Sequence, residues 1–326
     1  MIYDFFQGDF SVTATEDCEQ LAKLLKDTYT PKKKDAIYVS KLYKNMGFMF
    51  GDKRSLKIAE KMYQCGNFLV FKKEGEKRKL VYINSCKARF FPMCAWRKSL
   101  KIYSETIQVT EYMQRQRPSS KFIFLTLTQR NVEYAGLKDE IEKIIKGLRN
   151  LLRVKEIRAV TLGTMRNIEI TYNVQTQEWH PHVHMILHVT SLYAQGGQYG
   201  AYIHQPRWVY LWQRAMNLDY APNVDVRMLK PSKKGNHREL AEIAKYAVKP
   251  SAITDDYRNI AILEGALFHK RLLSYTGTFK EARQILKLKD NLTDEDTFVQ
   301  EDDGVYELYQ WHFGKQEYER TSRFTL

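Results

Sequence analysis

The segment His180-Pro181-His182-Val183-His184-Met185-Ile186-Leu187-His188 decides the fold of the central part of this chain. Four histidines fall within these nine residues, in a stretch whose other members are mostly apolar. Such a stretch predicts a β-strand, on which residues two apart point to the same face. His182 and His184 are therefore expected to present two imidazoles side by side, while Val183 faces the other way.

A second β-rich segment, residues 159–173, precedes this strand, and the polar residues between them predict an antiparallel hairpin. A turn centred near residue 176 places Glu169 opposite His184 and Thr171 opposite His182. Glu169 then shares the face of the imidazoles. A His-His-carboxylate set suits a divalent cation such as Mg²⁺ or Mn²⁺ and leaves coordination positions open for a substrate oxygen. His180 is either an outer partner of this site or a loop residue.

Helices and strands alternate around the hairpin. The predicted elements are strand 121–129, helix 139–152, helix 206–216, strand 223–228 and helix 237–248. Residues 252–288 are predicted to be helical, with breaks at Gly265 and Gly277. Since a tight hairpin requires antiparallel pairing, the sequence predicts an α+β fold, in which a mainly antiparallel sheet is covered by helices.

The first third of the chain is predicted to be mainly helical, with helices at 16–29, 52–63 and 96–115 and short strands at 67–71 and 80–83. Asp52 is expected to cap the second of these helices. Pro118-Ser119-Ser120 and an acidic run at 290–303 suggest boundaries. They divide the chain into a helical region (1–118), a sheet-containing domain (119–288), and an acidic linker with a C-terminal tail (289–326).

Charge gives the first indication of a partner. The 326 residues include 52 Lys and Arg against 38 Asp and Glu, a net charge of +14. This excess favours nucleic acid over a membrane surface, because no basic amphipathic helix with a clean apolar face is visible. A basic surface without such a partner is the alternative.

No apolar run approaches the ~20 residues of a membrane span, and no secretory signal or disulfide pattern is present. The sequence therefore predicts a cytoplasmic protein with no membrane partner.

The segment from Glu239 to Pro250 is strongly helical in pattern, and it places Glu242, Tyr246 and Lys249 on one face. A tyrosine phenol titrates near pH 10, so it needs a cation or a lysine nearby to act as a nucleophile on a phosphodiester. A carboxylate beside it could position or activate water. The chain has 21 tyrosines, so a tyrosine followed by a lysine on a helix is weak evidence by itself. It indicates a catalytic tyrosine only because the histidine cluster occurs in the same chain.

Three segments in order resemble the motifs of the rolling-circle replication initiators of small Gram-positive plasmids, which are members of the HUH endonuclease superfamily. The segments are Phe124–Asn131, His180–His184 and Glu242–Lys249. The match is to the branch that pairs a single tyrosine with an upstream glutamate. The resemblance implies an enzyme that nicks one strand at a plasmid's double-strand origin. It also implies a five-stranded antiparallel catalytic sheet within 119–288 and a DNA-binding N-terminal region.

The resemblance implies a role for each matching residue. His182 and His184 would hold the metal with Glu169 as third ligand, and Tyr246 would attack the scissile phosphate to leave a 5′-phosphotyrosine and a 3′-OH primer. Glu242 would activate water for the terminating cleavage, and Lys249 would assist at the phosphate. The implied partners are single-stranded or cruciform origin DNA and a host helicase, since the chain has no P-loop motif. Its assembly state is left open, a homo-oligomer included.

Cys65, Cys86 and Cys94 resemble the cysteine-rich knuckle of the same branch, with Phe91 at the position of a further family cysteine. Either another group or water completes a structural zinc site, or zinc is lost and apolar packing replaces it. Basic residues that are candidates for DNA contact are Arg97, Lys98, Arg130, Lys230, Lys233 and Lys234.

Two other functions compete with the initiator. An HUH transposase or mobilisation relaxase would share the metal and the tyrosine but would rejoin the DNA, whereas Glu242 favours hydrolysis. A non-catalytic DNA-binding regulator would use the histidines for structure or for zinc. Only the co-occurrence of the three motifs argues against it.

Overall fold

A computed structural model describes residues 14–15, 18–75, 77–194, 201–229, 238–245, 248, 256–288 and 304–325. The chain divides into two compact units. One comprises Met1–Lys98, Asp255–Tyr257 and Lys289–Leu326, and the other Ser99–Thr254 and Arg258–Leu288. Each unit contains a five-stranded sheet. Within the described residues, no helix combines the length and apolar character of a membrane span.

The sheet of the second unit has the strand order β7-β4-β6-β5-β8, with every neighbouring pair antiparallel. Its strands are β4 (Lys121–Leu127), β5 (Thr161–Asn173), β6 (Glu178–Val189), β7 (Val224–Met228) and β8 (Ser274–Gly277). The helices of this unit are α6 (Leu137–Arg153), α7 (Lys155–Val160), α8 (Gln205–Met216), α9 (Arg238–Ala244) and α11 (Thr278–Ile285). α5 (Pro92–Gln116) and α10 (Tyr257–Leu267) have most of their residues in it.

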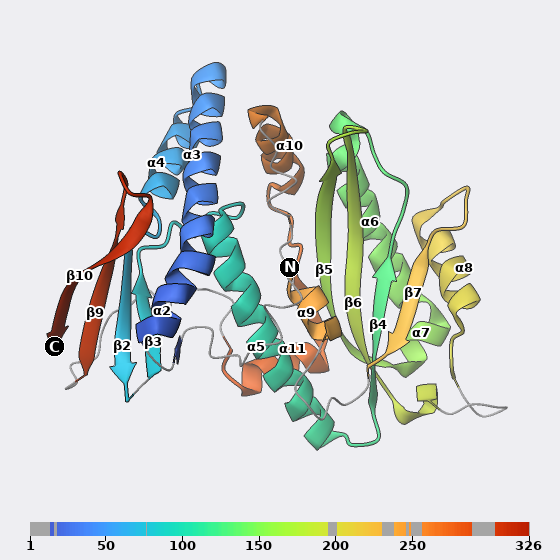
Figure 1. Cartoon of the computed structure of the whole chain (residues 1–326). Coiled ribbons are helices and arrows are strands. Elements are labelled where there is room, and N and C mark those ends of the chain that lie inside the picture. Colours follow the sequence, from blue (N-terminus) through green and yellow to red (C-terminus); the bar gives the residue numbers. More distant parts are fainter. Residues whose placement is uncertain are drawn as a thin grey trace. The chain divides into compact units, whose positions relative to one another are not determined.

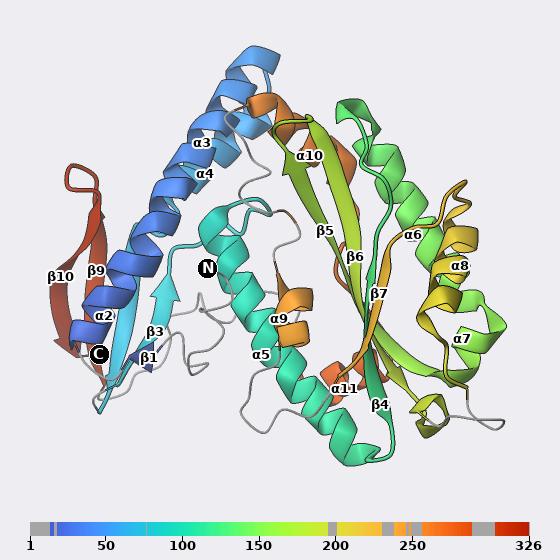
Figure 2. The ribbon, with the colours of Figure 1, turned by 45° about the vertical axis from the view of Figure 1, so that its right-hand side comes forward.

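Helices cover both faces of this sheet. α6 and α8 lie on one face, and α9 and α11 lie on the other (Figures 1 and 2). α6 packs through an apolar stripe that includes Ile141, Ile144 and Leu148, all essentially buried. The predicted α+β class with an antiparallel sheet between helices is confirmed.

The structure corrects the prediction for residues 252–288. Gly265 does not break a helix but lies inside α10, and the four residues of β8 form the fifth strand of the sheet. Among the described residues, β8 pairs only with β5, at positions 163–166, and it is too short to show strand periodicity. A side chain at Gly277 would collide with the carbonyl oxygen of Leu162, so this close approach requires glycine.

The β5–β6 hairpin differs from its predicted register by two residues. Glu169 lies opposite His182, not His184, and Asn167 lies opposite His184. The turn is centred slightly earlier than expected because the Asn173 carboxamide accepts hydrogen bonds from the backbone N–H groups of Gln175 and Thr176. A slip of two residues preserves the face, so Glu169 still points to the same side as the imidazoles.

The first unit begins with the predicted helical region. After β1 (Ala14–Thr15), its helices are α2 (Cys18–Leu24), the π-helical turn η1 (Leu25–Tyr29), α3 (Thr30–Phe50) and α4 (Lys53–Gln64). Asp52 caps α4 as predicted, since its carboxylate accepts hydrogen bonds from the backbone N–H groups of Arg54 and Ser55. The strands β2 (Phe68–Glu74) and β3 (Lys77–Ile83) follow.

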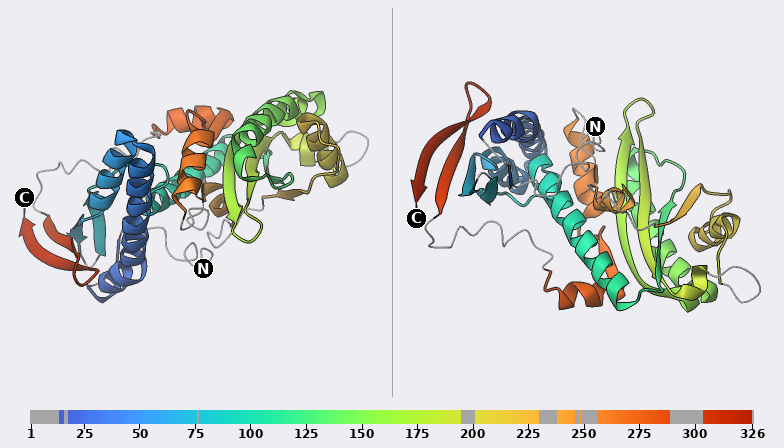
Figure 3. Two further views of the ribbon diagram at one scale, coloured as in Figure 1. Left: turned by 90° about the horizontal axis from the view of Figure 1, so that it is seen from above. Right: turned by 60° about the horizontal axis from the view of Figure 1, so that its bottom comes forward.

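The C-terminal segment completes the sheet of this first unit. β9 (Val305–His312) pairs with β2, and β10 (Glu317–Thr325) pairs with β9; these two strands are the red pair at the C-terminal end in Figure 3. The strand order of this sheet is β1-β3-β2-β9-β10. A buried ion pair of 3.0 Å joins Arg78 on β3 to Glu307 on β9, 229 residues later in the chain. The acidic run at 290–303 lies outside the described residues.

Candidate active site

Three side chains on the α9-covered face of the second sheet converge on one point. The Nε2 atoms of His182 and His184 lie 3.1 and 3.0 Å from the same oxygen, Oε2 of Glu169. Glu169 and His184 are buried, and His182 is slightly exposed. One ligand atom from each residue lies within 4.8 Å of the others. The predicted grouping of two imidazoles and a carboxylate is therefore present.

The far side of each imidazole is held by another group. Nδ1 of His182 lies 3.4 Å from the carbonyl oxygen of His180, and Nδ1 of His184 lies 3.3 Å from Oγ1 of Thr126. An Nδ1–H that donates to these oxygens leaves the lone pair of Nε2 directed to the point of convergence. Thr126 was not predicted, but it lies directly opposite His184 in the β4–β6 register.

Two of the three separations between the donor atoms fit a divalent cation. Neighbouring ligands in an octahedral Mg²⁺ site, each about 2.1 Å from the ion, lie about 3.0 Å apart. The observed separations of 3.0 and 3.1 Å between the imidazole nitrogens and the carboxylate oxygen match this value. Mixed nitrogen and oxygen ligands also suit Mn²⁺.

Glu242 on α9 stands at the edge of this group. Its Oε1 lies 3.7 Å from Nε2 of His184, its other oxygen bonds Nζ of Lys245, and its side chain is one-quarter exposed. The Asn167 amide donates hydrogen bonds of 3.0 Å to the carbonyl oxygens of Ile243 and Lys245. The end of α9 is thereby fixed to β5, and a solvent-accessible carboxylate stands beside the buried donors. Asn167, which sequence reasoning missed, lies opposite His184 in the hairpin.

Several predicted site residues lie outside the described residues, namely Tyr246, Lys249, Lys230, Lys233 and Lys234. The described residues nearest to Tyr246 along the chain are Lys245 and Val248. Both are tied to β5, Lys245 through Asn167 and Val248 through a parallel bridge to Ile170.

The other candidates occupy varied environments. Nδ1 of His180 donates a 2.6 Å hydrogen bond to Oδ1 of Asn131, and the His180 ring lies 5.3 Å from that of His182. Arg97 is largely buried, whereas Lys98 and Arg130 are exposed.

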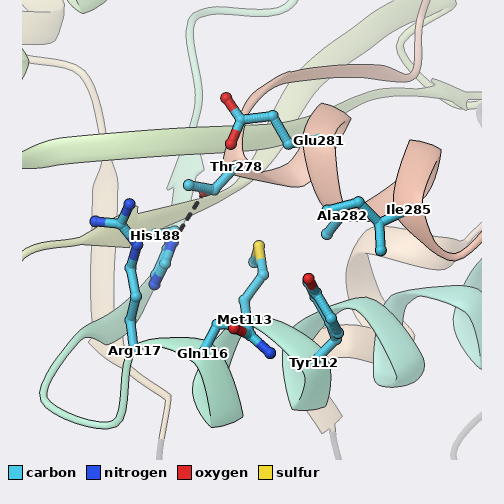
Figure 4. Close-up of a pocket in the computed structure, with 9 residues that line it drawn as sticks. All are labelled: Tyr112, Met113, Gln116, Arg117, His188, Thr278, Glu281, Ala282 and Ile285. Carbon is cyan, nitrogen blue, oxygen red and sulfur yellow. Dashed lines mark hydrogen bonds between the residues drawn. The ribbon is translucent and has the colours of Figure 1, made fainter.

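His188 lies four residues beyond His184 on the same face of β6. Its ring accepts or donates hydrogen bonds with the hydroxyls of Ser120 (2.7 Å) and Thr278 (2.9 Å), and burial, followed by the nearby Arg117, lowers its pKa to about 4. It forms part of the wall of a cavity of about 430 Å³ between α5 and α11 (Figure 4). His188 is therefore neutral and hydrogen-bonded through both ring nitrogens, as expected for a structural histidine.

The three cysteines of the first unit also converge. The Sγ atom of Cys94 lies 3.5 Å from that of Cys65 and 3.7 Å from that of Cys86, and the backbone N–H of Cys86 donates to Sγ of Cys65. Hydrogen bonds from the two other thiols lower the pKa of Cys94 to about 3. Phe91 is fully buried. Among the described residues, no fourth His, Cys, Asp or Glu joins this cluster.

Comparison with known proteins gives a consistent result. Residues 77–319 match the model of a family described as "Replication protein". A "Protein rep" of Bacillus amyloliquefaciens is 34% identical over 96% of this chain and 98% of its own length. A "Protein rep" of Streptococcus pneumoniae serotype 2 is 32% identical over 80% of this chain and 83% of its own length. A "Replication protein" of Staphylococcus aureus is 32% identical over 68% of this chain and 96% of its own length. No solved structure shows a significant match.

Proposed function

Since this chain belongs to the replication protein family, matching its model over residues 77–319, we propose that it starts rolling-circle replication of a plasmid by nicking one strand of the origin. The observation that carries the proposal is the convergence of Glu169, His182 and His184 beside Glu242. Buried imidazoles and a carboxylate at metal-ligand spacing, next to a solvent-accessible acid, are suited to phosphodiester chemistry.

The proposed metal ligands are His182, His184 and Glu169, with His180 as an outer partner. When bound, Mg²⁺ or Mn²⁺ would polarise a phosphate oxygen and offset the charge that develops there. The protein contributes rigid placement: each ligand sits on a central strand of the sheet, and hydrogen bonds outside the site hold the imidazoles in position.

Tyr246 is the proposed nucleophile. Its phenolic oxygen forms a bond to the phosphorus, the bond from phosphorus to the 3′ oxygen breaks, and the phenolic proton is transferred to that oxygen. The products are a 5′-phosphotyrosine link and a free 3′-OH primer. Lys249 is proposed to offset charge on the phosphate. The attachment of Lys245 and Val248 to β5 supports this assignment, since these residues flank Tyr246 in sequence.

The decisive experiment is a test for a covalent product. A single-stranded oligonucleotide from the origin of the protein's own replicon, incubated with the full chain and Mn²⁺, should give a protein–DNA adduct that survives denaturing electrophoresis. EDTA should prevent the adduct, because the donor trio then holds no cation. A non-catalytic regulator would bind the DNA in both conditions and give no adduct, which would contradict the proposal.

Glu242 is proposed to activate the water that ends replication. Glu242→Ala should leave the first nick nearly unchanged but slow the terminating hydrolysis by ~10²–10⁴-fold, the usual contribution of a general base. The measurement is the rate at which the preformed adduct hydrolyses a second oligonucleotide that carries the nick site. Glu239→Ala, on the same helix, is the matched control and should behave as wild type. Equal loss of both steps in Glu242→Ala would show that Glu242 only positions α9.

A transposase or a relaxase would instead rejoin the cleaved strand. The position of Glu242, one-quarter exposed and 3.7 Å from His184, favours hydrolysis and therefore the initiator. We propose that the exposed Lys98 and Arg130, with Lys230, Lys233 and Lys234, contact origin DNA. Arg97, also predicted to do so, is 9% exposed and so too buried for such a contact. A host helicase would separate the strands.

For the cysteine cluster we propose a structural Zn²⁺ held by Cys65, Cys86 and Cys94, with water in the fourth position. The three Sγ atoms lie close enough to share one ion. Elemental analysis of the purified protein should find one zinc per chain, and Cys94→Ser should lose it and lower the Tm. Protein without zinc that keeps its Tm in a chelator would refute this assignment.

A further inference from the structure

A polar pocket of about 270 Å³ lies in the second unit, between the loop after β4, the loop after α8 and the first part of α6. Arg130 and Asn131 contribute from the first loop, Tyr220 from the second, and Glu140 from α6. None of these residues belongs to the proposed metal site.

The pocket is joined to the metal site through a single histidine. Asn131 lines the pocket, and its Oδ1 lies 2.6 Å from Nδ1 of His180. Its amide nitrogen donates to Glu178, so Oδ1 is the acceptor and His180 donates. The His180 ring lies 5.3 Å from that of His182. A nucleotide next to the phosphate at the metal site would therefore reach the pocket.

Hydrogen bonds hold the loops around the pocket in place without a ligand. The backbone N–H and the hydroxyl of Thr128 both donate to the carbonyl oxygen of Asn223. The indole N–H of Trp212 donates to the carbonyl oxygen of Thr128 at 3.0 Å. The backbone N–H of Arg130 donates to the hydroxyl of Tyr220 at 2.7 Å. A preformed pocket avoids the entropy cost of ordering loops on binding.

The chemistry of the lining favours a base over a phosphate. The Arg130 guanidinium lies 3.9 Å from the centre of the Tyr220 ring, and its side chain is about two-thirds exposed, which leaves a flat cation available for stacking. Its ion pair with Asp219, 3.6 Å long and open to solvent, is too weak to hold it in place. Arg130 and Lys143 are balanced by Glu140 and Asp219, so the pocket is not a phosphate site.

We propose that this pocket binds one unpaired base of the nucleotide adjoining the scissile phosphate. The base stacks on the Arg130–Tyr220 pair, and its polar edge bonds the Asn131 amide and the Glu140 carboxylate. The inference rests on the proposed function and adds to it a site that selects where the strand is cut.

The test uses the full chain and short fluorescent single-stranded oligonucleotides that span the nick region of its own replicon. Each base is replaced in turn by an abasic site, and affinity is measured by fluorescence anisotropy in EDTA, where no cleavage occurs. With wild type, one abasic position adjoining the nick should weaken binding by ~5- to 150-fold, equivalent to the ~1–3 kcal/mol of a stacked base. In the double variant Arg130→Ala/Tyr220→Leu, the abasic site at the same position should weaken binding by less than about twofold.

Arg117→Ala is the matched control. It removes another exposed arginine of the same unit, at the cavity shown in Figure 4, and should keep the full abasic penalty. An equal penalty in wild type and in the double variant, or no penalised position beside the nick, would overturn the pocket assignment. Failure to form the covalent adduct would instead overturn the proposed function, because the affinity measurement does not depend on cleavage.

Discussion

Tyr246→Phe should abolish the covalent protein–DNA adduct, lowering its rate of formation by at least ~10³-fold. The substitution removes only the phenolic oxygen, so no atom remains to bond the phosphorus. Affinity for the same single-stranded oligonucleotide should stay within about threefold of wild type, because the ring is kept and the metal ligands lie elsewhere. The adduct is measured by denaturing electrophoresis with Mn²⁺ present, and the affinity by fluorescence anisotropy.

The control for this variant is another tyrosine-to-phenylalanine change in the same unit. Tyr210 on α8 is exposed and lies on a helix that covers the face of the sheet opposite the proposed metal ligands, so Tyr210→Phe should form the adduct at the wild-type rate. An adduct of undiminished yield from Tyr246→Phe would show that a different residue is the nucleophile.

The second large effect is expected at Glu169. Glu169→Gln keeps the size of the side chain but removes the anionic oxygen that both imidazoles approach. Affinity for Mn²⁺ and the rate of adduct formation should both fall by at least ~100-fold. This loss is larger than the ~10- to 100-fold that follows from mutating residues that only hydrogen-bond to metal ligands. Calorimetric titration with Mn²⁺ measures the first, and the adduct assay measures the second.

A change at an acid remote from the site provides the comparison. Glu142→Gln, on the exposed side of α6, should bind Mn²⁺ as wild type does. Partial recovery of the Glu169→Gln activity at raised Mn²⁺ would confirm a defect in metal binding, whereas unchanged Mn²⁺ affinity would exclude Glu169 as a ligand. A thermal melt by circular dichroism verifies that the variant is folded.

The hairpin that carries the proposed metal ligands could be predicted because its signal is local. Two strands joined by a short polar turn show which residues share a face, and the period of two tolerates the error of two residues in the predicted register. Glu169, His182 and His184 therefore lie on one face, as predicted, although the predicted pairing of Glu169 with His184 across the hairpin was wrong. The partners Thr126 and Asn167 depended on the true register and were missed.

The parts that were not predicted depend on contacts between distant segments. β8 has only four residues, and its pairing with β5 is determined by a close approach at two glycines. The first unit's sheet needs β9 beside β2, and Glu307 is buried against Arg78 across more than 200 residues. No local periodicity indicates such a partner, since a strand's pattern shows its buried face and not its neighbour.

The attachment of β9 and β10 to β2 affects the order in which the protein can fold during synthesis. The segments of the unit with the metal ligands end at residue 288, so this unit can close as soon as that part of the chain has left the ribosome. The N-terminal helices and their two strands, although made first, must wait with an uncovered edge until the last strands emerge. The unit with the proposed metal ligands can therefore be finished before the unit whose first strands precede it along the chain.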